Sequence, residues 1–239
     1  VRSAALDAWV WTACGWLSRA EPIGQQMLDT LYTGLVQDAR LGMQAAHALR
    51  VLTLHSRLVS PSRGFVVRRL YRQRAMETML VALTKELEGR RTAREPCLVA
   101  MATLLPGATD ALVSMHLPTW LPLLVHTLGM DDAPVRLTCA RTLQRIVSRD
   151  HAAALLEHLP LLVPRLLEAA ATPQAPRLRV AALQALQALT DAVPAAHLDA
   201  YRRAVVQALG RPRRGVDDAV RAVRTAAVDC RAAWYATQE

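Results

Sequence analysis

The sequence predicts an all-α protein in which helical pairs stack side by side along the chain. Apolar residues make up 52% of the 239 residues, and there is a single phenylalanine. Leucine and alanine dominate this apolar fraction; both favour helix, and the small alanines let neighbouring helices approach closely. The second observation is a phrase that recurs three times in the second half of the chain at nearly constant spacing. Composition and recurrence together favour repeated helical units.

The recurring phrase begins with His-Leu and leads to an apolar-Arg pair that is followed by small residues. The His-Leu pairs start at residues 116, 158 and 197, and the apolar-Arg pairs are Val135-Arg136, Leu178-Arg179 and Val223-Arg224. These pairs lie 43 and 45 residues apart, and HEAT and armadillo repeats have periods of about 40–47 residues. One such unit cannot bury its apolar face alone, so it stacks on its neighbours. The pattern predicts an α-solenoid of about 5–6 HEAT-type hairpins.

We expect residues 1–239 to form a single HEAT-repeat domain. Its clearest repeats are predicted at residues 116–157, 158–196 and 197–239. Because the chain starts with valine in a stretch that already has a helical pattern, we expect it to be the C-terminal part of a longer solenoid.

The first half of the chain has helical patterns separated by proline and glycine. Helices are predicted over residues 3–17, 22–37, 39–56, 63–88, 96–105 and 109–115. Pro22 is suited to the first position of its helix, since it has no amide hydrogen to leave unpaired there. Gly89 follows the long helix over 63–88 and is a typical stop signal.

Residues 111–130 carry no charged side chain and are long enough to cross a bilayer. Pro118 and Pro122 interrupt this run, so we predict two short helices and a turn inside the protein core, and no membrane partner. His116, His158 and His197 recur at one repeat position, which we place before the start of a helix. Such recurrence favours a structural role over metal binding.

The last predicted helix has two stripes. Every third or fourth residue forms an apolar stripe that we expect to face inward: Val216, Val220, Val223, Ala227, Cys230 and Trp234. A second stripe lies about 100° around the helix: Arg221, Arg224, Val228, Arg231 and Tyr235. Nothing in the sequence follows to cover it. It is either a solvated cap, as terminal repeats often have, or a docking surface for another protein.

Signatures of catalysis are missing from the sequence. There is no Gly-x-Gly-x-x-Gly, no Walker-type loop, no Gly-x-Ser-x-Gly and no His-Glu-x-x-His. The acidic pairs Asp131-Asp132 and Asp217-Asp218 come just before predicted helices, where carboxylates cap free N–H groups. Cys14, Cys97, Cys139 and Cys230 are widely spaced, which favours buried free thiols in a reducing compartment. We therefore expect no catalytic residue, no metal ligand and no cofactor.

The net charge of +9 is concentrated in one segment. Residues 40–74 contain eight arginines and no acidic residue. Clustered cations suit phosphate binding, so a nucleic-acid-binding helical-repeat protein is the alternative function. Only Phe65 and Tyr71 are available there to stack on bases. An acidic protein partner, a solvated face and a compositional bias of the genome explain the arginines as well.

Four segments of the chain resemble the C-terminal HEAT-repeat domain of the MMS-nineteen family. They are Trp9-Val10, residues 70–74 (Leu-Tyr-Arg-Gln-Arg), residues 179–190, and the closing residues 223–235. The last two are the most specific, and the four segments follow the family's order along nearly the whole chain. Ala226 departs from the family, which usually has an acidic residue there.

The resemblance implies a non-catalytic scaffold of cytosolic iron–sulfur cluster assembly, found in cytoplasm and nucleus. In that family this domain holds a small assembly protein with an acidic patch and a β-propeller. The complex serves apo iron–sulfur enzymes of DNA replication and repair. Four isolated cysteines do not supply the close spacing that a cluster needs, so we predict that this domain carries none.

We therefore expect a protein-binding surface made mainly of arginines. Its candidate residues are Arg68, Arg69, Arg72, Arg179, Arg221, Arg224, Arg231, Trp234 and Tyr235.

Overall fold

The computed structural model describes residues 2–37, 41–53, 69–89, 94–147, 149–211 and 214–237. Throughout these ranges the secondary structure is helical and contains no strand. The prediction of an all-α, solenoid-like fold is therefore confirmed. The chain divides into two compact units, Val1–Val113 and Ser114–Glu239.

The first unit contains most of the shorter helices. Its helices are α1 (Arg2–Ser18), α2 (Pro22–Gln37), α3 (Gly42–Ala48), α4 (Arg50–Thr53), α5 (Arg69–Gly89), α6 (Arg94–Leu104) and the 3₁₀ turn η2 (Leu105–Gly107). Helix α1 packs on α2, and α6 packs on α3 and α5. A Cβ atom at Gly24 would lie 2.8 Å from the backbone nitrogen of Leu17, so glycine is what lets α2 approach α1 so closely.

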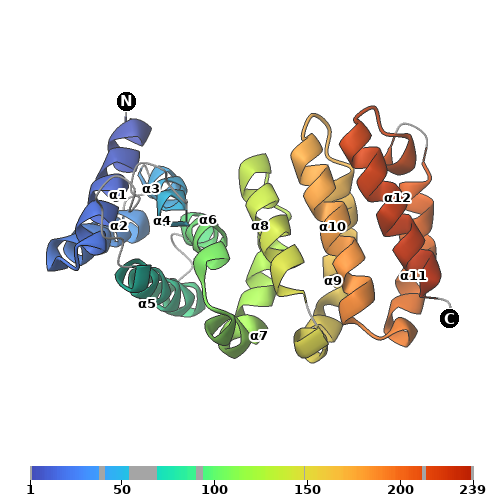
Figure 1. The fold of residues 1–239 in the computed structure, drawn as a ribbon, viewed down its shortest axis with the longest axis horizontal. Helices are drawn as coiled ribbons and strands as arrows, with labels where there is room; N and C mark the ends of the chain where they lie inside the picture. The colour runs from blue at the N-terminus through green and yellow to red at the C-terminus, as the bar shows by residue number, and fades with distance from the viewer. Residues whose placement is uncertain are drawn as a thin grey trace. The chain divides into compact units, whose positions relative to one another are not determined.

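The second unit consists of longer helices in regular pairs. They are α7 (Asp110–Thr127, which begins just before the unit), α8 (Ala133–Ile146), η3 (Arg149–His151), α9 (Ala152–Ala170), α10 (Pro176–Ala192), α11 (Ala195–Leu209), η4 (Gly215–Asp217) and α12 (Arg221–Ala236). Helix α10 packs against α8, α9 and α12, and α11 packs against α9 and α12. Figure 1 shows α8, α10 and α12 side by side in one layer. The second helix of each pair thus stacks on the second helix of the next.

The three apolar-Arg pairs occupy one position in this stack. Arg136, Arg179 and Arg224 are each the fourth residue after the N-cap of α8, α10 and α12. The apolar residue before each arginine is buried: Val135, Leu178 and Val223. The period found in the sequence is therefore the period of the second helices, each with its first turn packed into the core.

The prediction of two short helices within residues 111–130 is wrong, because α7 runs without interruption through Pro118 and Pro122. Helix α9 contains Pro160 and Pro164 in the same arrangement. All four prolines are exposed. Each proline frees the carbonyl one turn before it, and on the exposed side water replaces the lost hydrogen bond. The helix therefore continues.

The predicted position of the recurring histidines also needs correction. His116 lies inside α7 and His158 lies inside α9, whereas His197 is in the first turn of α11. The ring of His116 stacks on Trp120 with 5.1 Å between the ring centroids. Among the described residues, no helix is both long enough and apolar enough to cross a membrane.

Candidate protein-binding surface

Helix α12 places an apolar stripe in the core, as the sequence predicts. Val223, Ala227, Cys230 and Trp234 are all fully buried. The indole nitrogen of Trp234 donates a hydrogen bond of 3.0 Å to the carbonyl oxygen of Leu186, which ties α12 to α10.

Val216 and Val220 do not belong to this stripe, contrary to the prediction. Helix α12 begins only at Arg221, Val220 is its N-cap, and Val216 is part of the 3₁₀ turn η4. Val220 is consequently 37% exposed. The turn before α12 breaks the helical spacing from which the six-residue stripe was inferred.

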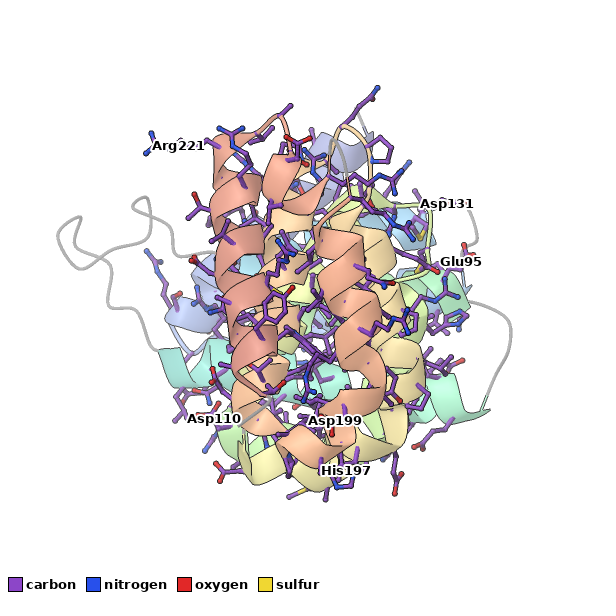
Figure 2. The ribbon with its side chains drawn as sticks, turned by 90° about the vertical axis from the view of Figure 1, so that its right-hand side faces the viewer. Glu95, Asp110, Asp131, His197, Asp199 and Arg221 are labelled. Atoms are coloured by element: carbon purple, nitrogen blue, oxygen red, sulfur yellow. The ribbon has the colours of Figure 1, made fainter. Side chains whose placement is uncertain are left out.

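The second stripe of α12 faces away from the core. Val228 is 54% exposed, Tyr235 is 46% exposed, and Arg221 is exposed as well. In Figure 2, α11 and α12 lie side by side at the end of the second unit that faces the viewer. Arg221 is at one end of this face, with its side chain pointing away, and His197 and Asp199 are at the opposite end. The α11–α12 pair thus offers a broad outer face.

Arg231 and Tyr235 form a single contact on this face. The central carbon of the Arg231 guanidinium lies 5.4 Å from the centroid of the Tyr235 ring, which is within the range of a cation–π interaction. One terminal nitrogen of Arg231 donates a 3.3 Å hydrogen bond to the Tyr235 hydroxyl. The Nε of Arg231 is buried and has no hydrogen-bond partner in the described structure. The cation is therefore held in place while part of it stays at the surface.

Arg224 and Arg202 hold the two ends of α12. A terminal nitrogen of Arg224 donates to the carbonyl oxygens of Asp218 (2.7 Å) and Ala219 (3.1 Å), at the turn before the helix. Arg202 of α11 donates to the hydroxyl oxygen (3.0 Å) and the carbonyl oxygen (2.8 Å) of Thr237. These contacts indicate that Arg224 has a structural role, which makes it a poor position for testing partner binding.

Arg179 joins successive helical pairs. It donates to the carbonyl oxygen of Thr172 and to Asp218 Oδ1, each at 3.0 Å. The side chains of this ion pair are only 12% and 7% exposed, respectively. Asp218 Oδ1 also accepts the backbone N–H of Val220 at 2.8 Å. The pair therefore connects α10 to the turn before α12 inside the protein.

The candidate surface in this unit is narrower than the sequence predicts. Trp234 is completely buried and Arg179 is nearly so, which leaves neither with the exposed area that a partner would contact. Val228, which the stripe contained but the predicted surface omitted, is exposed beside the remaining residues. We call the set of Arg221, Val228, Arg231 and Tyr235 the α12 surface.

The other arginines of the predicted surface belong to the first unit. Arg68 and the side chain of Arg69 lie outside the described residues, as do residues 40 and 54–68 of the basic segment. Arg72 is part of α5 and is half-buried. Its charge acts on Cys14 of α1: burial raises the pKa of the Cys14 thiol to about 11, and the Arg72 guanidinium opposes that rise.

All four cysteines are free and buried. Burial raises the pKa of Cys97 to about 11, with a smaller contribution from Glu86, and raises that of Cys230 to about 12. The pKa of the fully buried Cys139 is raised further. These thiols are protonated at neutral pH. Within the described ranges, no three His, Cys, Asp or Glu side chains are grouped as a metal ion requires.

One polar contact in the second unit was not foreseen. Ser114 Oγ of α7 lies 3.0 Å from Nε2 of His151, and Nδ1 of His151 lies 2.8 Å from the carbonyl oxygen of Ile146. Because only a protonated Nδ1 can donate to that carbonyl, Nε2 is free to accept the serine hydroxyl hydrogen. The contact connects α7 to the turn before α9.

Comparison with known proteins identifies the family. Residues 1–190 match the family model MMS19_C, described as RNAPII transcription regulator C-terminal. The chain is 29% identical over 236 residues to the human MMS19 nucleotide excision repair protein homolog and 30% identical to that of Danio rerio. It is 26% identical over 238 residues to the DNA repair/transcription protein mms19 of Schizosaccharomyces pombe.

These alignments cover 97–98% of the chain but only 22% of each relative. Among solved structures, an engineered protein is similar with a TM-score of 0.63 and 16% identity, covering 98% of this chain and 90% of that one. This second likeness concerns the fold alone. The family match, in contrast, extends over most of the sequence, and the chain belongs to the MMS19 C-terminal family.

Proposed function

We propose that the chain is a non-catalytic protein-binding scaffold. The observation that supports this function best is the α12 surface, where Arg231 is held over Tyr235 next to the exposed Val228. Tyrosine and arginine are enriched among the residues that dominate binding energy at protein interfaces. A fixed cation beside an exposed valine suits a partner that has an acidic region next to an apolar side chain.

The family suggests which partners these are. We infer that the chain holds a small assembly protein with an acidic patch and a β-propeller, and that this complex delivers iron–sulfur clusters to apo-enzymes of DNA replication and repair in cytoplasm and nucleus. The names of the matched relatives, which refer to nucleotide excision repair and transcription, support the repair part of this role.

In this proposal the chain acts by holding its partners at fixed positions on a stack of helices. Helices α8, α10 and α12 form a continuous layer in which each helix is packed on the next. The buried pair of Arg179 and Asp218 fixes α12 relative to α10. A partner on the α12 surface is therefore held at a defined position in the stack, without any chemical step by the chain itself.

The test is co-purification with the two partner subunits after changing only exposed side chains. The variant Arg221→Glu with Tyr235→Ala removes a cation and an aromatic ring from the α12 surface and leaves the Arg179–Asp218 pair intact. A control, Arg177→Glu with Leu161→Ala, makes the same charge reversal and truncates an exposed apolar side chain on α10 and α9. We expect the first variant to lose the partner subunits and the control to retain them.

Circular dichroism and thermal unfolding should be the same for both variants, since none of the four side chains is buried. If the α12 variant retains both subunits as well as the wild-type chain does, the α12 surface is not the binding site.

A further inference from the structure

A groove lies between the first helices of the last two pairs, α9 and α11, on a part of the unit that the α12 surface does not include. Its volume is about 430 Å³. Its lining includes Ala170, Ala171, Ala204, Ala208, Arg211 and Arg214.

The groove is hollow because its walls are made of small side chains. Ala170 and Ala171 end α9, and Ala204 and Ala208 face them from α11. Leu167 and Leu209 add apolar area at the floor. A volume of this size accommodates a few residues of an extended chain, with a small apolar side chain placed between the two helices.

The charge at the rim is positive and uncompensated. Arg211 and Arg214 are both exposed, and in the described part of the chain neither guanidinium is paired with a carboxylate. Glu168, the one acidic residue among the described residues that line the groove, is already paired with Arg165 at 2.9 Å. Two free cations next to an apolar hollow are complementary to a segment that contains both carboxylates and small apolar side chains.

The turn that follows Arg214 has a backbone conformation that requires glycine. Gly215 has a positive φ of 55°, and a Cβ atom at this position would lie only 2.1 Å from the carbonyl oxygen of Leu209. Only glycine allows the turn to approach the end of α11 this closely. The backbone N–H of Asp217 donates to the carbonyl oxygen of Arg214 at 3.0 Å and closes the turn. Arg214 is thus presented to a ligand by a pre-formed backbone.

We propose that this groove binds an acidic peptide segment of a partner protein, with its carboxylates on Arg211 and Arg214 and a small apolar side chain between Ala171 and Ala204. A nucleic acid is a poorer match, because the groove walls are mainly alanine and leucine and no described residue of the lining has an aromatic ring on which a base would stack.

Fluorescence anisotropy with the 239-residue chain tests this proposal. The probe is a fluorescein-labelled 12-residue peptide of Ala, Leu and Glu, compared with a peptide in which every Glu is replaced by Gln. We expect Arg211→Glu with Arg214→Glu to weaken binding of the Glu peptide about tenfold, as the loss of two exposed ion pairs implies. The control Arg141→Glu with Arg177→Glu makes the same change in net charge at exposed positions outside the groove.

A second pair of variants tests whether the open volume of the groove is needed for binding, without changing the charge. Ala204→Trp fills the groove, whereas Ala200→Trp adds the same ring one turn earlier on the exposed face of α11. We expect only Ala204→Trp to reduce binding. Equal affinities of the wild-type chain and the Arg211→Glu, Arg214→Glu variant for the Glu peptide would overturn the proposal, as would equal effects of the two tryptophans.

A single-stranded oligonucleotide of matched charge serves as competitor. Displacement of the peptide at lower concentration than unlabelled Glu peptide would show a nucleic-acid site instead and reject the proposal. The Arg221→Glu, Tyr235→Ala variant is expected to bind the peptide normally, so failure of the α12 surface and failure of the groove are separate results.

Discussion

The two units use similar polar contacts in very different surroundings. In the second unit, Arg179 and Asp218 are 3.0 Å apart and only 12% and 7% exposed; in the first, Arg50 and Asp7 are 2.9 Å apart but 61% and 27% exposed. The distances are nearly equal, whereas the burial is not. Exposed ion pairs contribute about 0–1 kcal/mol, whereas losing one partner of a buried pair costs about 3–5 kcal/mol. Burial, and not distance, therefore decides what each contact is worth.

Two tryptophans repeat this contrast. The indole nitrogens of Trp234 and Trp9 donate to the carbonyl oxygens of Leu186 (3.0 Å) and Met27 (2.9 Å), respectively. Trp234 is fully buried, whereas Trp9 is 42% exposed. The same hydrogen bond thus belongs to the core of one unit and to the surface of the other.

Replacing the two tryptophans should give the largest difference between the units. We expect Trp234→Ala to lower the free energy of unfolding by about 4 kcal/mol, because it leaves a cavity between α12 and α10, and Trp9→Ala to lower it by only about 1 kcal/mol. Urea denaturation followed by circular dichroism measures both. Comparable losses would contradict the difference in burial.

The ion pairs should rank next. Asp218→Ala leaves the Arg179 guanidinium buried without its carboxylate and removes the acceptor of the Val220 N–H, so we expect a loss of about 3 kcal/mol. Asp7→Ala should cost less than about 1 kcal/mol, since water replaces the partner of Arg50. A double-mutant cycle with Arg179→Ala isolates the pair: a coupling near zero would mean that Asp218 acts only through the turn.

The buried thiols should make both units less stable in alkali. Burial raises the pKa of Cys14 to about 11 and that of Cys230 to about 12, from an ordinary value near 9. The folded chain therefore keeps these protons longer than the unfolded chain. Their stabilising contribution is complete below about pH 9 and is lost as the pH rises through the raised values.

We expect each of these two cysteines to account for about 1 kcal/mol of stability lost per pH unit above pH 9. Urea midpoints at pH 8, 9 and 10 measure the slope in the wild-type chain and in Cys14→Ala and Cys230→Ala. Slopes that do not change in either variant would show that other groups govern the alkaline response.

The smallest expected effect comes from the helical prolines. Pro160→Ala restores the N–H that α9 lacks at an exposed position, so we expect a gain of about 0.5 kcal/mol. A loss of stability in Pro160→Ala would mean that the bend it imposes is needed for packing.

The sequence predicted the stack well where its signal came from packing. The apolar-Arg pairs recur because each lies in the first buried turn of α8, α10 or α12, and a residue that must fit the same neighbour recurs at the same spacing. The prediction from sequence failed for prolines on the exposed side of a helix, where the rule that proline ends a helix does not hold. Pro118 and Pro122 normally end a helix, but on the solvent side α7 tolerates them.

The candidate surface was harder to predict for a related reason. The same side chain has three different roles in the second unit. Arg179 forms a buried ion pair, Arg224 donates to backbone carbonyls, and Arg231 lies over a tyrosine ring at the surface. Only the neighbouring residues distinguish these roles. Those neighbours come from other helices and turns. Arg211 and Arg214 had no sequence signal at all, since the groove beside them exists only when α9 and α11 lie next to each other.

The proline pairs of α7 and α9 also have a mechanical consequence. Each pair removes two backbone hydrogen bonds, one turn apart, from the outer side of its helix. Helix α11 has Asp199 and Arg203 at the corresponding positions, and both have the backbone N–H that proline lacks. If a bound partner bends the second unit, α7 and α9 should bend more easily than α11, which should be the stiffest of the three helices.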